Sequence, residues 1–225
     1  LPLTWGLILK HRLYDWGYAT EPEPGMDNRR IECARGKVLG GSSSINGMAY
    51  GRGAAQDYDC WANELGLEGW SYADVLPYFR RSESWAEGAS ELRGGSGPLT
   101  VNRLSFEDPL LDAFMSSAQQ LGYPRNSDYN ARSPVGFGPM QVTIRKGRRW
   151  SAASAYLRPA VARGNVVVRT GVLANRVLLE NGRAVGVEFR AAGKTEKVFA
   201  RREVLLAGGV INSPQLLMLS GIGPA

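Results

Sequence analysis

The sequence is poor in the residues from which most metal and hydrolytic sites are built. Its 225 residues include one histidine, His11, and two cysteines, Cys33 and Cys60, with no CxxC pair. One histidine and two separated cysteines would make a poor zinc site. A Ser-His-acid triad would also need a GxSxG turn, which is missing. We therefore expect no metal site and no triad here, and we expect His11 to be a surface residue. Two thiols in a chain of this size are typical of a reduced, cytosolic protein.

Long apolar runs and a complete dinucleotide fingerprint are also missing. No apolar stretch approaches the roughly 18 residues of a membrane span, and residues 1–9 lack a signal-peptide pattern. We predict a cytoplasmic protein, or one peripheral to a membrane, with no transmembrane segment. No GxGxxG follows a strand and opens a helix, because Gly136-Phe137-Gly138 precedes a proline. If a dinucleotide binds, its pyrophosphate loop lies outside this sequence.

The positive charge of the chain is spread out rather than gathered. The formal net charge is +6 and the sequence pI about 9.5. The densest basic group is Arg145, Lys146, Arg148 and Arg149, with Trp150 beside it. A nucleic-acid surface would need a longer basic stripe or a reading helix. We therefore expect no nucleic-acid partner, and we interpret this group as a solvated face or a site for one anionic group.

What the sequence does have is a glycine-serine loop, residues 35–46, reading RGKVLGGSSSIN. Gly40 and Gly41 lack a Cβ and adopt backbone angles closed to other residues, so a flat or anionic group can approach the main chain closely. The three serines, residues 42–44, add hydroxyl groups and backbone N–H donors. The alternative is a flexible surface turn. Apolar residues on both sides of the loop argue against it: Val38, Leu39, Ile45 and Met48.

Helical patterns occur mainly in the first two thirds of the chain. Apolar spacing predicts a helix over 57–65, and Ser71 with Asp74 predicts a capping box that opens a second, which Pro77 should bend. The clearest helix spans 108–121, with Asp108 as N-cap, Pro109 in the first turn, and an apolar stripe that we expect in the core. The stripe is Leu110, Leu111, Phe114, Met115, Ala118 and Leu121. A short helix over 151–157 should end before Pro159.

Strand patterns dominate the last third. We predict strands over 98–101, 166–169, 174–179, 184–189 and 203–207, with a hairpin at Asn181-Gly182. The last strand runs into Gly208-Gly209 and then a helix that Ser213 should cap, with Pro214 in its first turn. Such a strand-glycine-helix unit brings backbone amides toward a phosphate or ribityl oxygen, although many such glycines serve packing alone. The order of elements predicts an α/β protein with an antiparallel excursion.

Two glycine motifs, taken together, identify a family resemblance. Residues 35–53 resemble the first signature of the glucose-methanol-choline (GMC) oxidoreductases, and Gly209 to Gly223 resembles the second. Their separation is similar to that in the family. Between them, GWSYADVLPYF at 69–79 and GFGPM at 136–140 resemble the choline-dehydrogenase-like branch. The resemblance covers nearly the whole chain.

The resemblance implies an FAD/NAD(P)-binding Rossmann-like domain of α/β class, with the start of an α+β antiparallel-sheet substrate domain. It implies FAD as cofactor and oxidation of an alcohol to an aldehyde by hydride transfer to flavin N5. Electrons would pass to oxygen or to a quinone-like acceptor. The residues it assigns to the flavin side are Val38, Gly40, Gly41, Ser42, Asn46, Gly47, Met48 and Ala49, and it assigns Ala174 to the adenine. Some members attach FAD through a histidine at the place of Ile45, so non-covalent FAD is expected.

The resemblance also implies that part of the enzyme lies elsewhere. The chain begins with Leu1 and ends at Ala225, directly after an organised motif, so we expect an internal fragment. Residues 1–77 would belong to the FAD-binding domain, 78–103 to the first segment of the substrate domain, and 104–225 to the FAD-binding domain again. The GxGxxG unit and the catalytic histidine with its partner would lie outside, leaving no catalytic residue here. A non-catalytic flavin-binding fragment, or a lyase or photochemical member of the fold, remains an alternative.

Overall fold

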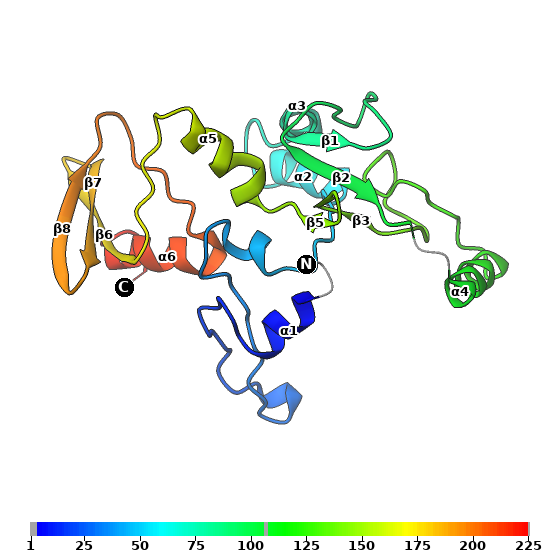
Figure 1. Ribbon diagram of the computed structural model, residues 1–225, viewed down its shortest axis with the longest axis horizontal. Helices are drawn as coiled ribbons and strands as arrows, with labels where there is room; N and C mark the ends of the chain where they lie inside the picture. Colours follow the sequence, from blue (N-terminus) through cyan, green and yellow to red (C-terminus); the bar gives the residue numbers. More distant parts are fainter. Residues whose placement is uncertain (1–3, 106–107, 225) are drawn as a thin grey trace. The chain divides into compact units, whose positions relative to one another are not determined.

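The computed structural model describes residues 4–105 and 108–224, and Figure 1 labels its α-helices and most of its strands. The described chain divides into two compact units, residues 1–165 and 166–225.

The first unit begins with short helices and irregular chain. Its opening elements are α1 (Trp5–Lys10), η2 (Pro24–Met26), η3 (Gly41–Ser44), α2 (Ala55–Asn63) and α3 (Tyr72–Ser82). The capping box predicted at Ser71 is present, since the Ser71 hydroxyl accepts from the Asp74 N–H and the Asp74 carboxylate accepts from the Ser71 N–H. The predicted helix start is confirmed, and the helix continues past Pro77 to Ser82.

A small mixed sheet forms the centre of the first unit. Its strands are β1 (Glu83–Trp85), β2 (Leu99–Arg103) and β3 (Gln141–Val142), in the order β1-β2-β3, with β1 parallel and β3 antiparallel to β2. Val101 and Val142 are 0% and 4% exposed, so the core of the unit lies at this sheet. A two-residue hairpin, β4 (Ile144–Arg145) with β5 (Arg148–Arg149), follows β3. The predicted strand 98–101 is thus confirmed as β2.

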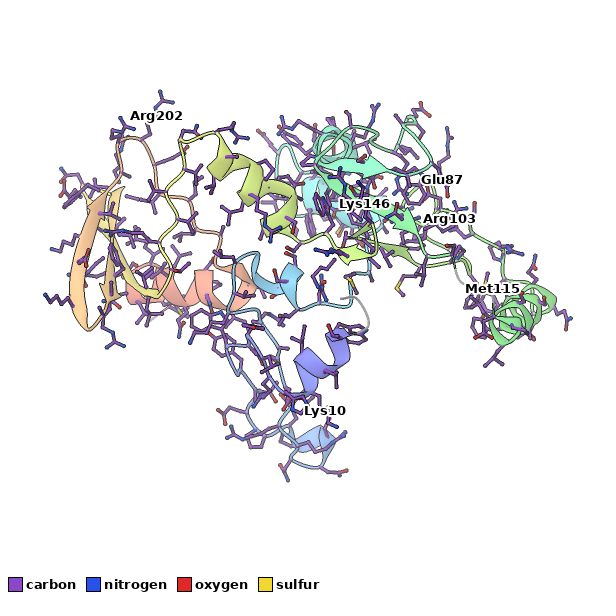
Figure 2. All side chains as sticks on the ribbon, in the orientation of Figure 1. Lys10, Glu87, Arg103, Met115, Lys146 and Arg202 are labelled. Atoms are coloured by element: carbon purple, nitrogen blue, oxygen red, sulfur yellow. The ribbon has the colours of Figure 1, made fainter. Side chains whose placement is uncertain are left out.

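The helix α4 (Pro109–Gln120) has the predicted cap but not the predicted burial. The Asp108 carboxylate accepts from the Leu110 N–H at 2.8 Å, and Pro109 stands in the first turn. Of the stripe that we expected in the core, only Met115, labelled in Figure 2, and Ala118 are buried, whereas Leu110 and Leu121 are each 78% exposed. The expectation was therefore wrong for Leu110, Leu111, Phe114 and Leu121, which stay exposed in the described chain. Of these, Phe114 meets the ring of Phe137 edge-on at 5.4 Å.

The predicted helix at 151–157 is present in a different form. It is a π-helix, η4 (Ala153–Leu157), that runs directly into α5 (Arg158–Ala162). The expectation that it would end before Pro159 was wrong. Pro159 falls in the first turn of α5, and the Arg158 N–H bonds to the Ala153 carbonyl, so the ordinary α-helical ladder is already interrupted where the proline lacks its N–H.

The second unit is a three-stranded antiparallel meander with one helix. Its strands β6 (Val172–Glu180), β7 (Arg183–Ala191) and β8 (Lys194–Phe199) lie side by side in that order (Figure 1). The predicted hairpin is confirmed, with Asn181 at φ 49° and Gly182 at φ 77°, the left-handed angles that a tight hairpin requires. Helix α6 (Gly209–Leu219) is tied to β6 through the Ser220 hydroxyl, which accepts from the Val177 N–H at 2.8 Å.

Three sequence predictions fail in this unit. Residues 166–169 and 203–207 form no strand, because neither segment pairs with a strand among the described residues, and β8 was not foreseen. The final helix begins at Gly209 rather than after Ser213. Ser213 still serves the helix start, since its hydroxyl accepts from the Gly208 N–H at 3.0 Å. It therefore satisfies an N-terminal donor from inside the helix.

Candidate cofactor site

The glycine-serine loop, residues 35–46, turns sharply through its two glycines. Gly40 has φ 90° and Gly41 φ 54°, both in the left-handed region that side chains disfavour, and Gly41 opens the 3-10 turn η3. The Ile45 and Asn46 N–H groups both return to the Ser42 carbonyl, at 3.1 and 2.9 Å. The loop is therefore a defined turn and not a flexible linker.

The three serine hydroxyls hold the loop in this shape. Ser42 accepts from the Gly36 N–H at 3.1 Å, Ser43 donates to the Gly40 carbonyl at 2.5 Å, and Ser44 donates to the Leu39 carbonyl at 2.8 Å. Each hydroxyl thus satisfies backbone groups of the loop itself. The role that this geometry gives the hydroxyls is to fix the positions of the backbone amides.

The two glycines are required for different reasons. A Cβ on Gly40 would come 2.5 Å from the Ser44 hydroxyl and 3.1 Å from Ala153, so the protein's own packing needs a glycine there. A Cβ on Gly41 would meet no atom within 4 Å, and the same holds for Gly47. The loop therefore has a packed side at Gly40 and an open side at Gly41 and Gly47. A flat or anionic group could approach the backbone only from the open side.

The chain leaving the loop alternates between exposed and buried positions. Asn46, Gly47 and Ala49 are exposed. Met48 is 4% exposed and has φ 65°, and its N–H bonds to the Asn46 side-chain oxygen at 3.0 Å. Its carbonyl accepts from the Thr143 N–H at 2.9 Å, which fastens the segment to the residue after β3. Among the predicted flavin-side residues, Val38 and Ser42 are also exposed.

A segment distant in sequence, residues 149–153, supports the loop from its packed side. The Arg149 guanidinium donates to the Ser43 carbonyl at 3.1 Å and to the Asn46 side-chain oxygen at 2.7 Å. The Ala152 N–H donates to the Ser43 hydroxyl at 2.9 Å. We did not foresee this support, since the sequence indicated only a short helix. The one available signal was the run of small residues at 151–154, which permits close backbone approach.

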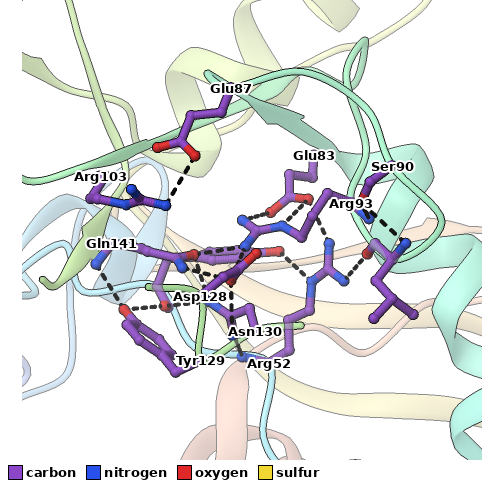
Figure 3. Close-up of polar contacts among 12 residues, drawn as sticks. Arg52, Glu83, Glu87, Ser90, Arg93, Arg103, Asp128, Tyr129, Asn130 and Gln141 are labelled. Atoms are coloured by element: carbon purple, nitrogen blue, oxygen red, sulfur yellow. Dashed lines mark hydrogen bonds and ion pairs between the residues drawn. The ribbon is translucent and has the colours of Figure 1, made fainter. Parts of the chain in front are cut away.

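A buried network of charged and amide side chains fixes the segment that follows the loop (Figure 3). At its centre lies Glu83, which is 0% exposed. Its carboxylate accepts from Arg52 at 2.5 Å and from the Nη2 and Nε of Arg93 at 2.7 and 3.0 Å. Arg93 also donates to Asp128 at 2.6 Å and to Gln141 at 3.0 Å. The network is paired throughout and therefore tolerates burial.

The network reaches the loop through Tyr50. The Tyr50 carbonyl accepts from Asn130 at 3.1 Å and from the Tyr129 hydroxyl at 2.9 Å. Burial, with a smaller contribution from Glu83, raises the pKa of the Tyr50 phenol against the opposing effect of Arg52. Burial lowers the pKa of Arg52, but the hydrogen bond that its Nε donates to the Tyr50 hydroxyl and the charge of Glu83 outweigh burial, so the pKa of Arg52 is raised.

Sequence reasoning missed this network. No motif or period drew attention to residues 83–97, although Glu83 and Arg93 are among the most buried side chains of the described chain. The signal was in the glycines. A Cβ on Gly94 would lie 1.9 Å from the Arg80 carbonyl oxygen, and one on Gly97 would lie 2.3 Å from Ser82. Glycines needed for such close backbone contact indicate a packed segment rather than a loop.

The remaining predicted position, Ala174, belongs to the second unit. It is an exposed residue of β6, paired with Phe189 of β7, and the register shifts between Ala174 and Arg176. His11 is exposed, as expected, and Cys33 and Cys60 are both free thiols. Within 4–105 and 108–224, no group of three or more His, Cys, Asp or Glu side chains could hold a metal ion. No helix in the same residues is long and apolar enough to cross a membrane.

Comparison with known proteins assigns this arrangement to a family. The family model described as GMC oxidoreductase matches residues 11–225. The chain belongs to the GMC oxidoreductase family. The match includes the glycine-serine loop, the supporting segment 149–153 and the buried network, and it confirms the family resemblance drawn from the two glycine motifs.

Relatives in the GMC family match almost the whole chain. The oxygen-dependent choline dehydrogenase of Rhizobium etli is 54% identical over 223 residues, which are 99% of this chain and 40% of that protein. The structure of pyridoxine 4-oxidase from Mesorbium loti has a TM-score of 0.91 at 37% identity, covering 99% of this chain and 44% of the other. An FAD-dependent oxidoreductase from Chaetomium thermophilum has a TM-score of 0.88 at 31% identity, covering 95% and 39%. The fold is that of the GMC oxidoreductases, and the predicted α/β class is confirmed.

Proposed function

We propose that this chain is the cofactor-loop portion of an FAD-dependent alcohol oxidoreductase that converts an alcohol to an aldehyde. The chain spans about 40% of the length of the choline dehydrogenases that it matches, so the activity is proposed for a longer protein. The observation that carries the proposal is the open side of the glycine-serine loop. Gly41 and Gly47 expose backbone there, while the opposite side is packed against Ala153.

The residues present fit FAD. The open backbone at Gly41 and Gly47 admits a flat ring without steric conflict. Asn46 is exposed and held at a fixed angle by Arg149 and by the Met48 N–H. We propose that Val38, Gly40, Gly41, Ser42 and the segment Asn46 to Ala49 form the flavin side of the site, with Ala174 at the adenine. FAD would supply the hydride acceptor, its N5.

The chain's own contribution is to bind and to orient. Internal bonds of the serine hydroxyls keep the loop amides in place before the cofactor arrives, which reduces the entropy lost on binding. The buried network holds the following segment at Tyr50 and Arg52, so the chain that leaves the loop is kept in place. In this proposal the base that takes the alcohol proton lies outside this chain.

We further propose that FAD is held without a covalent bond. Ile45 stands at the position where a linking histidine is found in some members, and its side chain carries no nucleophile. It is also 3% exposed, buried by the chain itself. A covalent link would need a reactive group at this point, and the hydrocarbon side chain offers none.

The proposal extends to the electron acceptor, the alcohol substrate and the cellular location. The named relatives favour oxygen as electron acceptor and choline as the first alcohol to test, with a quinone-like acceptor as the alternative. The division into FAD-binding residues 1–77 and 104–225 and a substrate-domain segment 78–103 stays a prediction. So does the cytoplasmic or membrane-peripheral location.

An anaerobic titration tests the proposed function. The full-length protein, reconstituted with FAD, is mixed without oxygen with choline, pyridoxine and simple primary alcohols, and the visible flavin absorbance is followed. We expect at least one alcohol to bleach the flavin, and admission of oxygen to restore the colour if oxygen is the acceptor. Bound flavin that no alcohol reduces, although dithionite reduces it, would contradict alcohol oxidation and favour a flavin-binding role alone or a lyase.

A further inference from the structure

One buried hydrogen-bond donor next to the glycine-serine loop has no acceptor within the described chain. Arg149 ends β5 and reaches the loop with one nitrogen, Nη1, which donates to both the Ser43 carbonyl and the Asn46 side-chain oxygen. Its other terminal nitrogen, Nη2, is buried and has no hydrogen-bond partner. Buried donors of native proteins are nearly always paired, more so when they are charged.

Arg149 also lacks a compensating negative charge. None of the described carboxylates forms an ion pair with it, and burial is the one cause that lowers the pKa of its guanidinium. Arg52 and Arg93, by contrast, are buried against Glu83. A half-buried positive charge that has no anion, and one terminal nitrogen fully buried without an acceptor, suits a ligand that brings an electron-rich oxygen.

The one comparable atom in the described chain has a different setting. The Arg103 Nε is also buried and unpaired, but the same guanidinium forms an ion pair with Glu87 at 2.9 Å and lies against the ring of Trp85. The Arg103 guanidinium therefore already has a counter-charge in Glu87, and among the described residues no contact joins it to the open side of the loop at Gly41 and Gly47. Arg149 differs on both points, because the residue that it orients, Asn46, directly precedes the open backbone of Gly47.

We propose that Arg149 is a cofactor-positioning residue: Nη1 sets the angle of Asn46 and the 3-10 turn, and Nη2 donates to an oxygen of the bound FAD. This inference rests on the proposed function and adds a residue that the family resemblance did not assign to the site. The oxygen belongs either to the isoalloxazine ring, whose negative charge increases on reduction, or to the pyrophosphate. Both are electron-rich oxygens, and the two cases differ in what the charge does to the flavin.

The test compares Arg149→Met with Arg148→Met in the full-length protein. Arg148 is the matched control because it is exposed and has the same charge on the same strand. The apoproteins are titrated with FAD. The midpoint potential and the affinity for sulfite, which adds to flavin N5, are then measured at saturating FAD. Far-ultraviolet circular dichroism of the apoproteins checks the fold.

We expect Arg149→Met to weaken FAD binding about tenfold or more, the effect of losing a hydrogen bond to a charged group, while Arg148→Met stays at the wild-type value. A lower midpoint potential and weaker sulfite binding would assign the oxygen to the isoalloxazine ring, since a lost cation no longer stabilises the reduced or adduct state. Unchanged values of both, with FAD binding still weakened, would assign it to the pyrophosphate.

Arg149→Met with wild-type FAD affinity and potential would overturn the inference. If that variant fails to fold, Arg149→Lys is compared with Arg148→Lys. Lysine keeps the charge, but its one nitrogen cannot donate to Ser43, Asn46 and the cofactor together, so the FAD affinity of Arg149→Lys should still fall. Equal FAD affinities of the two lysine variants would overturn the inference. Failure of the proposed function is distinguishable, because the wild-type protein would then bind no FAD, or bind FAD that no alcohol reduces.

Discussion

Replacing Glu83 by alanine should destabilise the protein severely. The carboxylate is 0% exposed and accepts four hydrogen bonds, from Arg52, from two nitrogens of Arg93 and from the Gly94 N–H. Removing it leaves two guanidinium groups in the core with only Asp128, on Arg93, as a remaining counter-charge. Breaking a buried ion pair in this way costs about 3–5 kcal/mol.

The magnitude can be judged against the stability of a typical domain. Natural domains have free energies of unfolding of about 5–15 kcal/mol, so the loss would be a large part of the total. Glu83→Gln keeps the shape but removes the charge and places an amide N–H against donors of arginine, and it should cost about 1.5–3 kcal/mol. The control is Glu91→Gln, whose ion pair with Arg132 joins side chains that are 82% and 85% exposed and should contribute nothing measurable.

The assay is urea unfolding of the full-length protein, followed by circular dichroism and by release of flavin. The expected order of midpoints is wild type equal to Glu91→Gln, then Glu83→Gln, then Glu83→Ala. A Glu83→Ala midpoint that corresponds to a loss of less than about 1 kcal/mol would refute the reasoning, because the network would then not hold the segment at Tyr50.

Three further predictions concern the loop and its surroundings. Gly41→Val should abolish FAD retention by placing bulk on the open side of the loop. Gly88→Val is the control, since Gly88 also has a positive φ, 96°, and free space around it, and this variant should retain normal flavin content. Equal flavin in both variants would contradict the site. Acid precipitation of the holoprotein should leave flavin in the supernatant, since Ile45 offers no nucleophile, and a yellow pellet would show a covalent link. Because burial raises the folded-state pKa of Tyr50 above its ordinary value of about 10, the stability that it contributes is complete below that pH and is lost as the pH rises toward the folded pKa. Tyr50→Phe should therefore flatten the fall in urea midpoint between about pH 9 and 11 relative to wild type, and an unchanged slope would show that Tyr50 does not contribute.

Local sequence rules predicted the elements whose causes are local. The capping box at Ser71, the cap and proline that open α4 and the Asn181-Gly182 hairpin each depend on neighbouring residues, and all three are present. Where the outcome depended on a distant partner, prediction failed. Residues 166–169 have strand-like composition but no paired neighbour in the described chain. The apolar stripe of α4 had the right period, but in the described chain only Met115 and Ala118 of it are buried.

Of the candidate site, too, only the features that depend on neighbouring residues were predictable. The loop, its two left-handed glycines and the family followed from the residues themselves, because glycine-rich turns and long signatures are local patterns. Gly40 lies on the packed side of the loop and Gly41 on the open side. This difference depends on Ala153, more than a hundred positions away, and could not be seen in the sequence. Arg149 and the Glu83 network were missed for the same reason. Their roles exist only after folding has brought 83–93 and 141–153 to the loop and the segment that leaves it.

Hydrogen–deuterium exchange of the full-length apoprotein with and without FAD tests the central claim most directly. The claim is that the open side of the glycine-serine loop receives the cofactor. FAD should slow exchange of the amides of residues 40–49, while the α4 peptide, residues 109–120, should exchange at the same rate in both states. Protein that binds FAD stoichiometrically without any change of exchange in residues 40–49 would contradict the claim.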